Sequence, residues 1–125
     1  MYLFDIIVLI DDDPINNLIN KRLIKKLEIS PQVEEFLEAE KALSFIKDLP
    51  PSTKMLALVD INMPVMNGWD FLLQYAPMVV NREDKIIMLS SSIDFQDRQK
   101  SKKFSYVNGF IEKPLTPEKL EKLLQ

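Results

Sequence analysis

The sequence predicts one α/β domain, built on a parallel five-stranded sheet with helices on both faces. Short apolar runs alternate with amphipathic segments five times along the 125-residue chain. Such strict alternation requires right-handed crossovers, which place helices on both faces of a parallel sheet. A hydrophobic fraction of 46% is enough for one core at this length. We therefore expect residues 1–125 to form a single domain.

The first β-α unit begins with Ile6–Ile10, a run rich in β-branched residues and typical of a strand buried on both faces. Asp13 is the expected N-cap of the next helix, with Pro14 at its first position. Apolar residues then recur at helical spacing as far as Leu27. This unit is the most clearly defined part of the predicted fold.

The second and third units follow the same order. Val33–Leu37 is a weaker strand candidate, and the helix predicted over Ala39–Leu49 is stopped by two prolines. Met55–Val59 is a second strong strand. The loop MPVMNG then leads into a helix from about Trp69, which Pro77 should end or kink.

The last two units complete the alternation. Ile86–Leu89 is a third strong strand, and the polar stretch 94–103 is predicted to be a solvent-facing helix with few core contacts. Phe110 and Ile111 form a short final strand. The last helix should begin with Thr116 as N-cap and Pro117 at its first position.

The composition excludes several kinds of chemistry. The chain has no cysteine, which excludes disulfides and thiolate metal sites, and no histidine, which excludes histidine catalysis and ligation. A net charge of −3 gives no reason to expect nucleic acid as a partner. No apolar run reaches the roughly 20 residues that span a bilayer, and the N-terminus lacks the basic start of a signal peptide. We expect a cytoplasmic protein that binds neither nucleic acid nor membrane.

Polar residues follow the strong strands at the points where they end. Three aspartates, Asp11 to Asp13, follow the strand Ile6–Ile10, and the strand Met55–Val59 ends at Asp60. Ser90 and Ser91 end the fourth strand, and Lys113 with a proline follows the fifth. Ligands of open parallel sheets bind outside the carboxyl ends of the strands. These side chains should therefore converge at one edge of the sheet.

This set of side chains suits phosphoryl transfer. Carboxylates brought together require a cation, and ligands that are all oxygen favour a hard ion such as Mg²⁺. A lysine and a hydroxyl opposite could hold an anionic group, so the site has the parts needed to neutralise a phosphoryl group. The nucleophile must then be a carboxylate, because the chain has neither histidine nor cysteine. Asp60, alone at a strand end, is the best candidate. For Asp13 the N-cap role is a sufficient explanation.

Four segments carry a resemblance to a known family. VLIDDDPINN, LVDINMPVMNGWDFL, IIMLSSS and GFIEKPLTP occur in this order. They resemble the receiver domain of two-component response regulators, across essentially the whole chain. The resemblance implies a flavodoxin-like fold with strand order 2-1-3-4-5.

The resemblance also implies a role for individual residues. Asp60 would accept a phosphoryl group from a phosphohistidine. Asp12, Asp60 and the backbone carbonyl of Asn62 would bind Mg²⁺, or Mn²⁺, directly, and Asp11 mainly through a bound water. Lys113 would bind a phosphoryl oxygen, and the Lys113-Pro114 peptide bond is often cis in this family.

Further positions of the family concern switching and dephosphorylation. Ser90 takes the hydroxyl position that moves toward the phosphoryl group, and Phe110 matches the aromatic residue that follows this movement. Asn62 and Ser92 occupy positions that tune dephosphorylation. Ser90 stands where threonine is commoner, so it lacks the methyl group that fixes the rotamer. Ser91 stands where alanine is frequent.

The leading hypothesis is a receiver domain without an output domain, which acts by phosphorylation-controlled binding and is not an enzyme. Its donor would be a histidine kinase or a histidine phosphotransfer protein. A downstream protein would bind the face formed by the fourth helix, fifth strand and fifth helix, and the chain would be a monomer or a phosphorylation-dependent dimer.

Two alternatives remain open from the residues. The first is a Mg²⁺-dependent phosphohydrolase of the haloacid dehalogenase type, with Asp11 as nucleophile and Asp13 completing a D-x-D pattern. The second is a scaffold that resembles a receiver but works independently of phosphorylation.

Overall fold

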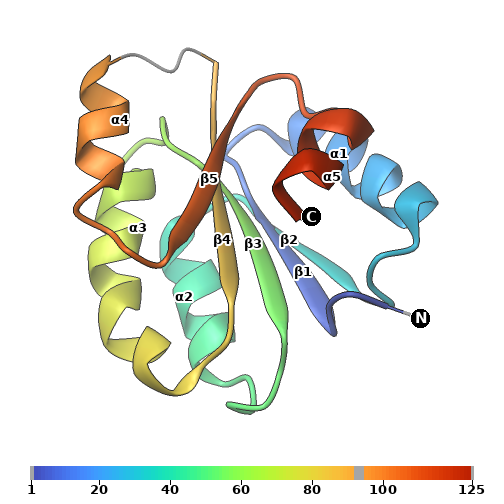
Figure 1. Cartoon of the computed structure of the whole chain (residues 1–125), viewed down its shortest axis with the longest axis horizontal. Helices are drawn as coiled ribbons and strands as arrows, with labels where there is room; N and C mark the ends of the chain where they lie inside the picture. Colours follow the sequence, from blue (N-terminus) through green and yellow to red (C-terminus); the bar gives the residue numbers. More distant parts are fainter. Residues whose placement is uncertain (1, 92–94, 125) are drawn as a thin grey trace.

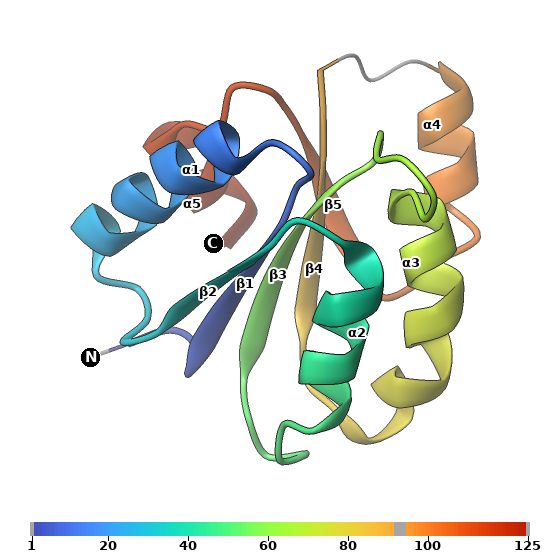
Figure 2. The same ribbon diagram turned by 180° about the vertical axis from the view of Figure 1, so that it is seen from behind.

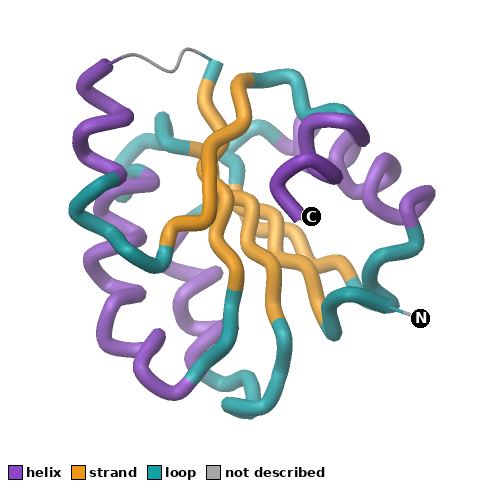
Figure 3. The backbone as a smooth tube through the Cα atoms, viewed as in Figure 1, coloured by secondary structure: helices purple, strands orange, loops and turns teal. Residues whose placement is uncertain are grey.

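A computed structural model of the chain describes residues 2–91 and 95–124. Five parallel strands form one sheet in the order β2-β1-β3-β4-β5, between two layers of helices (Figures 1 and 3). The predicted parallel sheet and its strand order are confirmed. In the part of the chain that the structure describes, no helix combines the length and the apolar character needed to cross a membrane.

The elements follow the predicted order with changed boundaries. Their bounds are β1 Ile6–Ile10, α1 Pro14–Leu27, β2 Val33–Phe36, α2 Ala39–Lys47, β3 Met55–Asp60, α3 Gly68–Tyr75, a 3₁₀ helix Ala76–Asn81, β4 Lys85–Ser90, α4 Phe95–Ser101, β5 Val107–Glu112 and α5 Pro117–Leu124. Asp60 is the last residue of β3, at the strand end where the sequence placed it. The α-helix expected to end or kink at Pro77 stops at Tyr75 and continues as the 3₁₀ helix.

The predicted helix starts are confirmed in detail. The side chain of Asp13 accepts a hydrogen bond from the backbone N–H of Ile15, and Pro14 is the first helical residue of α1. The hydroxyl oxygen of Thr116 accepts from the N–H of Lys119 at the start of α5. Both caps satisfy backbone donors that have no partner within the helix.

The sheet is longer at its far edge than the sequence predicted. β5 was expected as Phe110 and Ile111 alone, but it begins at Val107. Asn108 and Gly109 have low strand propensity and hide this extension in the sequence. The carboxamide oxygen of Asn108 accepts the N–H of Ile86 at 3.0 Å, where the register between β4 and β5 shifts. A side chain here replaces a ladder hydrogen bond of the backbone.

Two cores separate the sheet from its helices. Residues such as Val8, Val59 and Met88 point to the side covered by α2 and α3, whereas Leu9, Leu58 and Leu89 point to the side covered by α1 and α5. Figures 1 and 2 show these two layers from opposite sides. The three central strands, β1, β3 and β4, are therefore buried on both faces, whereas the outer strands β2 and β5 are partly exposed.

Candidate functional site

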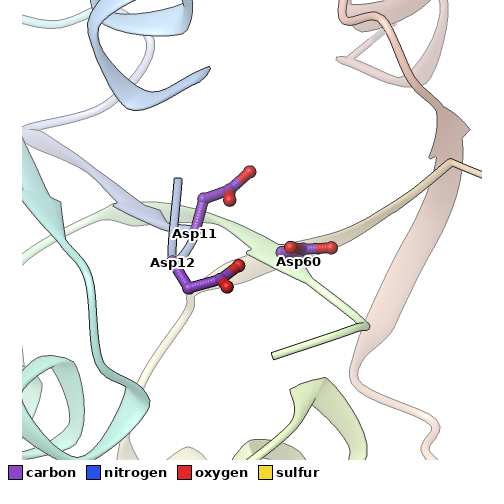
Figure 4. A group of neighbouring side chains, drawn as sticks. All are labelled: Asp11, Asp12 and Asp60. Atoms are coloured by element: carbon purple, nitrogen blue, oxygen red, sulfur yellow. The ribbon is translucent and has the colours of Figure 1, made fainter. Parts of the chain in front are cut away.

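Three carboxylates meet at the carboxyl edge of the sheet. Asp11 and Asp12 follow β1, and Asp60 ends β3 (Figure 4). One oxygen atom from each lies within 4.8 Å of the others. β1 and β3 are neighbours in parallel register, with Ile10 opposite Val59, so their ends coincide. The convergence predicted from the strand ends is present.

Lys113 completes the cluster from the loop after β5. Its ammonium Nζ lies 3.0 Å from Asp11 Oδ2 and 3.3 Å from Asp60 Oδ2. Its backbone N–H donates to the carbonyl of Ser90 at 2.7 Å, and the Lys113-Pro114 bond is cis. One ammonium therefore faces two carboxylates that are nearly inaccessible, at 2% exposure for Asp11 and 4% for Asp60.

The surroundings of the cluster shift the pKa values of both Asp60 and Lys113. Burial, and then the neighbouring charge of Asp11, raise the pKa of Asp60 above its ordinary value, although Lys113 acts in the opposite direction. Burial lowers the pKa of Lys113, but its hydrogen bond and charge attraction to Asp11, and the charge of Asp60, outweigh this effect and raise it. Lys113 is thus held as a cation, while Asp60 binds a proton more readily than an exposed aspartate.

The three consecutive aspartates have different environments. Asp11 is buried, and its Oδ1 accepts the N–H of Asp13 at 2.9 Å. Asp12 is exposed at the mouth of the cluster. Asp13 caps α1, as described above, and is also exposed. Only the first two belong to the cluster with Asp60, and the assignment of Asp13 to folding is confirmed.

The loop after β3 is shaped by one close approach. Asp60 Oδ1 accepts the N–H of Asn62 at 3.2 Å, and Asn62 is exposed. A Cβ atom at Gly68 would lie 2.8 Å from both the Asp60 carbonyl oxygen and the Ile61 Cα. Only glycine fits there without moving the backbone that carries Asp60. The glycine of MPVMNG thus sets the position of the candidate acceptor.

Two supporting residues were missed by the sequence analysis. Asn17 is buried at 1% exposure, and its amide group donates to the carbonyls of Asp11 and Phe36. It thereby joins the loops after β1 and β2. Lys119 Nζ donates to the carbonyls of Glu112 and Pro114, on either side of Lys113. The sequence carried no signal for Asn17, because the apolar residues of the first turns of α1, Ile15, Leu18 and Ile19, are exposed, whereas Asn17 and Asn20 lie on the buried face.

Two further candidate residues lie on β4 and β5. Ser90 is fully buried at the end of β4, opposite Glu112, and Phe110 is half-buried opposite Met88 on the neighbouring strand. The Phe110 ring lies 6.1 Å from the Trp69 ring, between centroids. Ser92 lies outside the described residues.

The cluster has the donor set of a hard cation. Its three carboxylates come from two strand ends, and a single ammonium neutralises one of their charges. Oxygen ligands with a residual negative charge fit a divalent ion such as Mg²⁺ and do not fit a soft metal. The residues present therefore fit the ion expected from the sequence.

Comparisons with known proteins agree with this geometry. The family model described as "Response regulator receiver domain" matches residues 7–125. A two-component response regulator from Cytophaga hutchinsonii is 27% identical, with a TM-score of 0.82, over 97% of this chain and 94% of that chain. No curated protein matches the chain significantly.

Two other solved structures share the fold at lower identity. A response regulator receiver protein from Dyadobacter fermentans is 23% identical, with a TM-score of 0.85, over 95% of this chain and 94% of that chain. The receiver domain of a sensor histidine kinase from Pseudomonas aeruginosa, solved with a magnesium ion in its active-site cleft, is 20% identical over 98% and 95%, with a TM-score of 0.77.

Three observations agree: the strand order, the acidic cluster at the carboxyl edge, and the family match over residues 7–125. They favour the receiver domain over the haloacid dehalogenase alternative. The chain belongs to the response regulator receiver domain family and is a phosphoacceptor of two-component signalling.

Proposed function

We propose that Asp60 is the residue that accepts the phosphoryl group. The observation that carries this assignment is the position of its carboxylate, at the end of a central strand, 3.3 Å from the Lys113 ammonium. Asp11 is less suited to the role because its contacts, to Lys113 at 3.0 Å and to the N–H of Asp13 at 2.9 Å, are shorter than those of Asp60 to Lys113 and Asn62, at 3.3 and 3.2 Å. Asp12 lies outside the pair that Lys113 contacts.

The chemistry is a displacement at phosphorus. An oxygen of ionised Asp60 attacks the phosphorus of a phosphohistidine, a P–O bond forms and the P–N bond breaks. The imidazole nitrogen leaves with the electron pair and takes up a proton. Lys113 stays charged, as its raised pKa favours, and pairs with the incoming phosphoryl oxygens.

The phosphohistidine belongs to a partner, because this chain has no histidine. A histidine kinase or a histidine phosphotransfer protein fits this role. Three apolar side chains on the first turns of α1 support such a contact, because Ile15, Leu18 and Ile19 are exposed at 65%, 45% and 55%. Ile19 also lines a hollow with Lys113. This apolar patch beside the acceptor suits a helical donor.

Asp11, Asp12, Asp60 and the backbone carbonyl of Asn62 would hold Mg²⁺, or Mn²⁺. When bound, the ion supplies positive charge against the phosphoryl oxygens and offsets the repulsion between the carboxylates. The magnesium ion in the receiver domain from Pseudomonas aeruginosa supports this choice.

Ser90 and Phe110 are the proposed switch residues. They lie on neighbouring strands, two register positions apart, and side chains on alternate positions share a face of the sheet. A movement of the Ser90 hydroxyl toward the phosphoryl group would make room for the Phe110 ring. The face formed by α4, β5 and α5 would then change its affinity for a downstream protein.

The chain would act as a regulatory phosphoacceptor and not as a turnover enzyme. The phosphoryl group stays on Asp60 until water removes it, and Asn62 and Ser92 would tune that rate. Each molecule of protein should accordingly take up at most one phosphoryl group.

Acetyl phosphate labelling tests the acceptor. Wild-type protein with Mg²⁺ should gain one phosphoryl group by intact mass, and Asp60→Asn should gain none, because an amide is not a nucleophile for phosphorus. Asp13→Asn is the matched control: it changes a neighbouring aspartate, keeps a good helix cap and should label like wild type.

Undiminished labelling of Asp60→Asn would remove Asp60 from this role. Many turnovers of acetyl phosphate per minute, lost in Asp11→Asn but kept in Asp60→Asn, would instead show a phosphohydrolase.

A further inference from the structure

A groove between α2 and α3 lies apart from the α1 patch and from α4, β5 and α5. It consists of two adjoining hollows of about 330 and 240 Å³. Its lining residues come from the loops after β2 and β3, from the first turn of α2 and from α3 between Asp70 and Gln74. Figure 2 shows α2 and α3 side by side, with the loop after β3 at their upper ends. We call this surface the α2–α3 groove.

Apolar side chains are exposed along the whole groove. Leu37 and Val65 line the larger hollow, and Val65 and Leu73 line the smaller one. Their exposed fractions are 50%, 97% and 64%. Met63 and Met66 lie beneath them, and methionine adapts to varied partners. Single exposed apolar residues are normal, but three along one groove form a patch typical of interaction sites. We call these three residues the apolar strip.

Val65 is the central residue of a tight turn beside the groove, in which the N–H of Met66 donates to the carbonyl of Pro64 at 2.8 Å. Its φ is 66°, in the left-handed region that β-branched residues strongly disfavour and glycine adopts freely. The side chain is almost fully exposed, so it contributes no packing that would offset the strain. Strained residues that persist in this way are concentrated at functional positions. The turn explains the backbone but not the side chain, because glycine would form the same turn without strain, and a partner that buries the exposed valine would explain its presence.

The charge of the groove is of one sign. Glu38, Glu40 and Asp70 line the two hollows, and among their described lining residues there is no lysine or arginine. Lys41 pairs with Glu38 at 3.7 Å, but both side chains are more than half exposed, and such pairs hold weakly. We call these three carboxylates the acidic rim. An apolar strip beside an acidic rim is complementary to a segment with the reverse pattern.

We propose that the α2–α3 groove binds a basic amphipathic segment of a protein partner. Large apolar side chains of that segment pack on the apolar strip, and its lysines or arginines pair with the acidic rim. The groove faces the side of the sheet opposite α1, so a phosphodonor on α1 leaves it accessible. The groove is thus a surface for a second partner, whose binding requires no phosphoryl group.

A peptide selection identifies the occupant. Random linear peptides displayed on phage are selected on immobilised wild-type protein and depleted on the double variant Val65→Asp/Leu73→Asp. The expected consensus carries two or more large apolar residues flanked by lysine or arginine. No enrichment, or an acidic or uncharged consensus, would overturn the proposal.

Binding of one synthesised peptide from the selection, measured by calorimetry, then tests the residues. Val65→Gly should weaken the peptide about tenfold, as expected for a central contact, while raising the melting temperature because the backbone strain disappears. Glu40→Lys should weaken it by charge reversal. The control Leu3→Asp changes an exposed leucine outside the groove and should bind like wild type.

Equal affinity for Val65→Gly and wild type, or an equal loss in Leu3→Asp, would exclude the groove. Asp60→Asn should bind the peptide with unchanged affinity. The result is therefore independent of whether Asp60 accepts phosphate, since labelling and peptide binding are measured separately.

Discussion

Two clusters of buried charge lie at opposite edges of the same sheet. At the amino edge, before β4, Asp84 Oδ2 accepts hydrogen bonds from Arg82 Nε at 2.6 Å and from the Tyr75 hydroxyl at 2.5 Å. Arg82 Nη1 also donates to the carbonyls of Leu49 and Pro50. At the carboxyl edge lies the cluster of aspartates around Lys113, described above. Both are buried, but only the first is balanced in charge.

The difference in charge separates a structural cluster from a binding site. One guanidinium meets one carboxylate at the amino edge, and a neutral phenol completes the set. Burial, and then the hydrogen bond to Asp84, raise the pKa of Tyr75 far above its ordinary value, so the phenol remains a donor. At the carboxyl edge two buried carboxylates share one ammonium, and exposed Asp12 adds a third negative charge that this ammonium does not contact. That set is balanced only when a cation joins it.

The largest effect is expected from breaking the balanced cluster. Asp84→Ala leaves the Arg82 guanidinium buried without its carboxylate, and should reduce the free energy of unfolding by about 3–5 kcal/mol. Urea denaturation measures the loss. The exposed neighbour provides the control, since Glu83→Ala should change stability by less than about 0.5 kcal/mol.

The same variant tests the separation of the two edges. Folded Asp84→Ala should take up one phosphoryl group from acetyl phosphate, as wild type does. A loss of stability below about 1 kcal/mol would mean that the cluster is not a buried ion pair of the expected kind.

A smaller effect is expected from Asp12, which belongs to the unbalanced edge. Asp12→Asn should leave the metal-free stability within about 0.5 kcal/mol of wild type, because the side chain is exposed. Added Mg²⁺ should stabilise wild type by mass action. The gain should be smaller for Asp12→Asn, and tenfold weaker binding would reduce it by about 1.4 kcal/mol. Thermal unfolding at graded Mg²⁺ concentrations measures this difference.

Asp13→Asn is the control here too, and it should keep the full gain from Mg²⁺. An equal gain in Asp12→Asn would remove Asp12 from the metal site. A gain in Asp84→Ala that matches wild type would confirm that the ion acts at the carboxyl edge alone.

The two edges also differ in how far the sequence predicted them. The carboxyl edge was predictable because Asp11, Asp60 and Lys113 each stand directly at a strand end, and parallel strands bring those ends together. The amino edge was missed. Arg82 and Asp84 lie in a polar connection without periodicity, and Tyr75 is apolar enough to be read as core. No local pattern indicates that these three side chains meet.

Supporting contacts were hidden for a related reason. The role of Asn17 depends on two carbonyls, one of them 19 residues away, and backbone carbonyls carry no signature in the sequence. The close approach at Gly68 likewise becomes visible only when the loop after β3 folds back on Asp60. The sequence therefore identified the charged side chains of the site and missed the groups that hold them.

The smallest of these effects concerns the repulsion at the carboxyl edge. Asp60→Asn removes a buried charge next to Asp11 and keeps the 3.0 Å pair between Asp11 and Lys113. The metal-free variant should therefore be more stable than wild type at neutral pH, by about 1 kcal/mol. Denaturation in a chelator measures the difference, and a wild type more stable than Asp60→Asn would contradict it.

The pH dependence of that difference distinguishes repulsion from a change in packing. The pKa of Asp60 is raised above its ordinary value of 3.8 by folding, so the folded protein gains the proton first as the pH falls. Wild type is stabilised by this uptake between the raised pKa and 3.8, whereas the asparagine cannot titrate. The advantage of Asp60→Asn should therefore shrink as the pH is lowered through this window. If the greater stability of Asp60→Asn did not change with pH, it would come from packing. The carboxyl edge would then carry no unrelieved charge for a cation to neutralise.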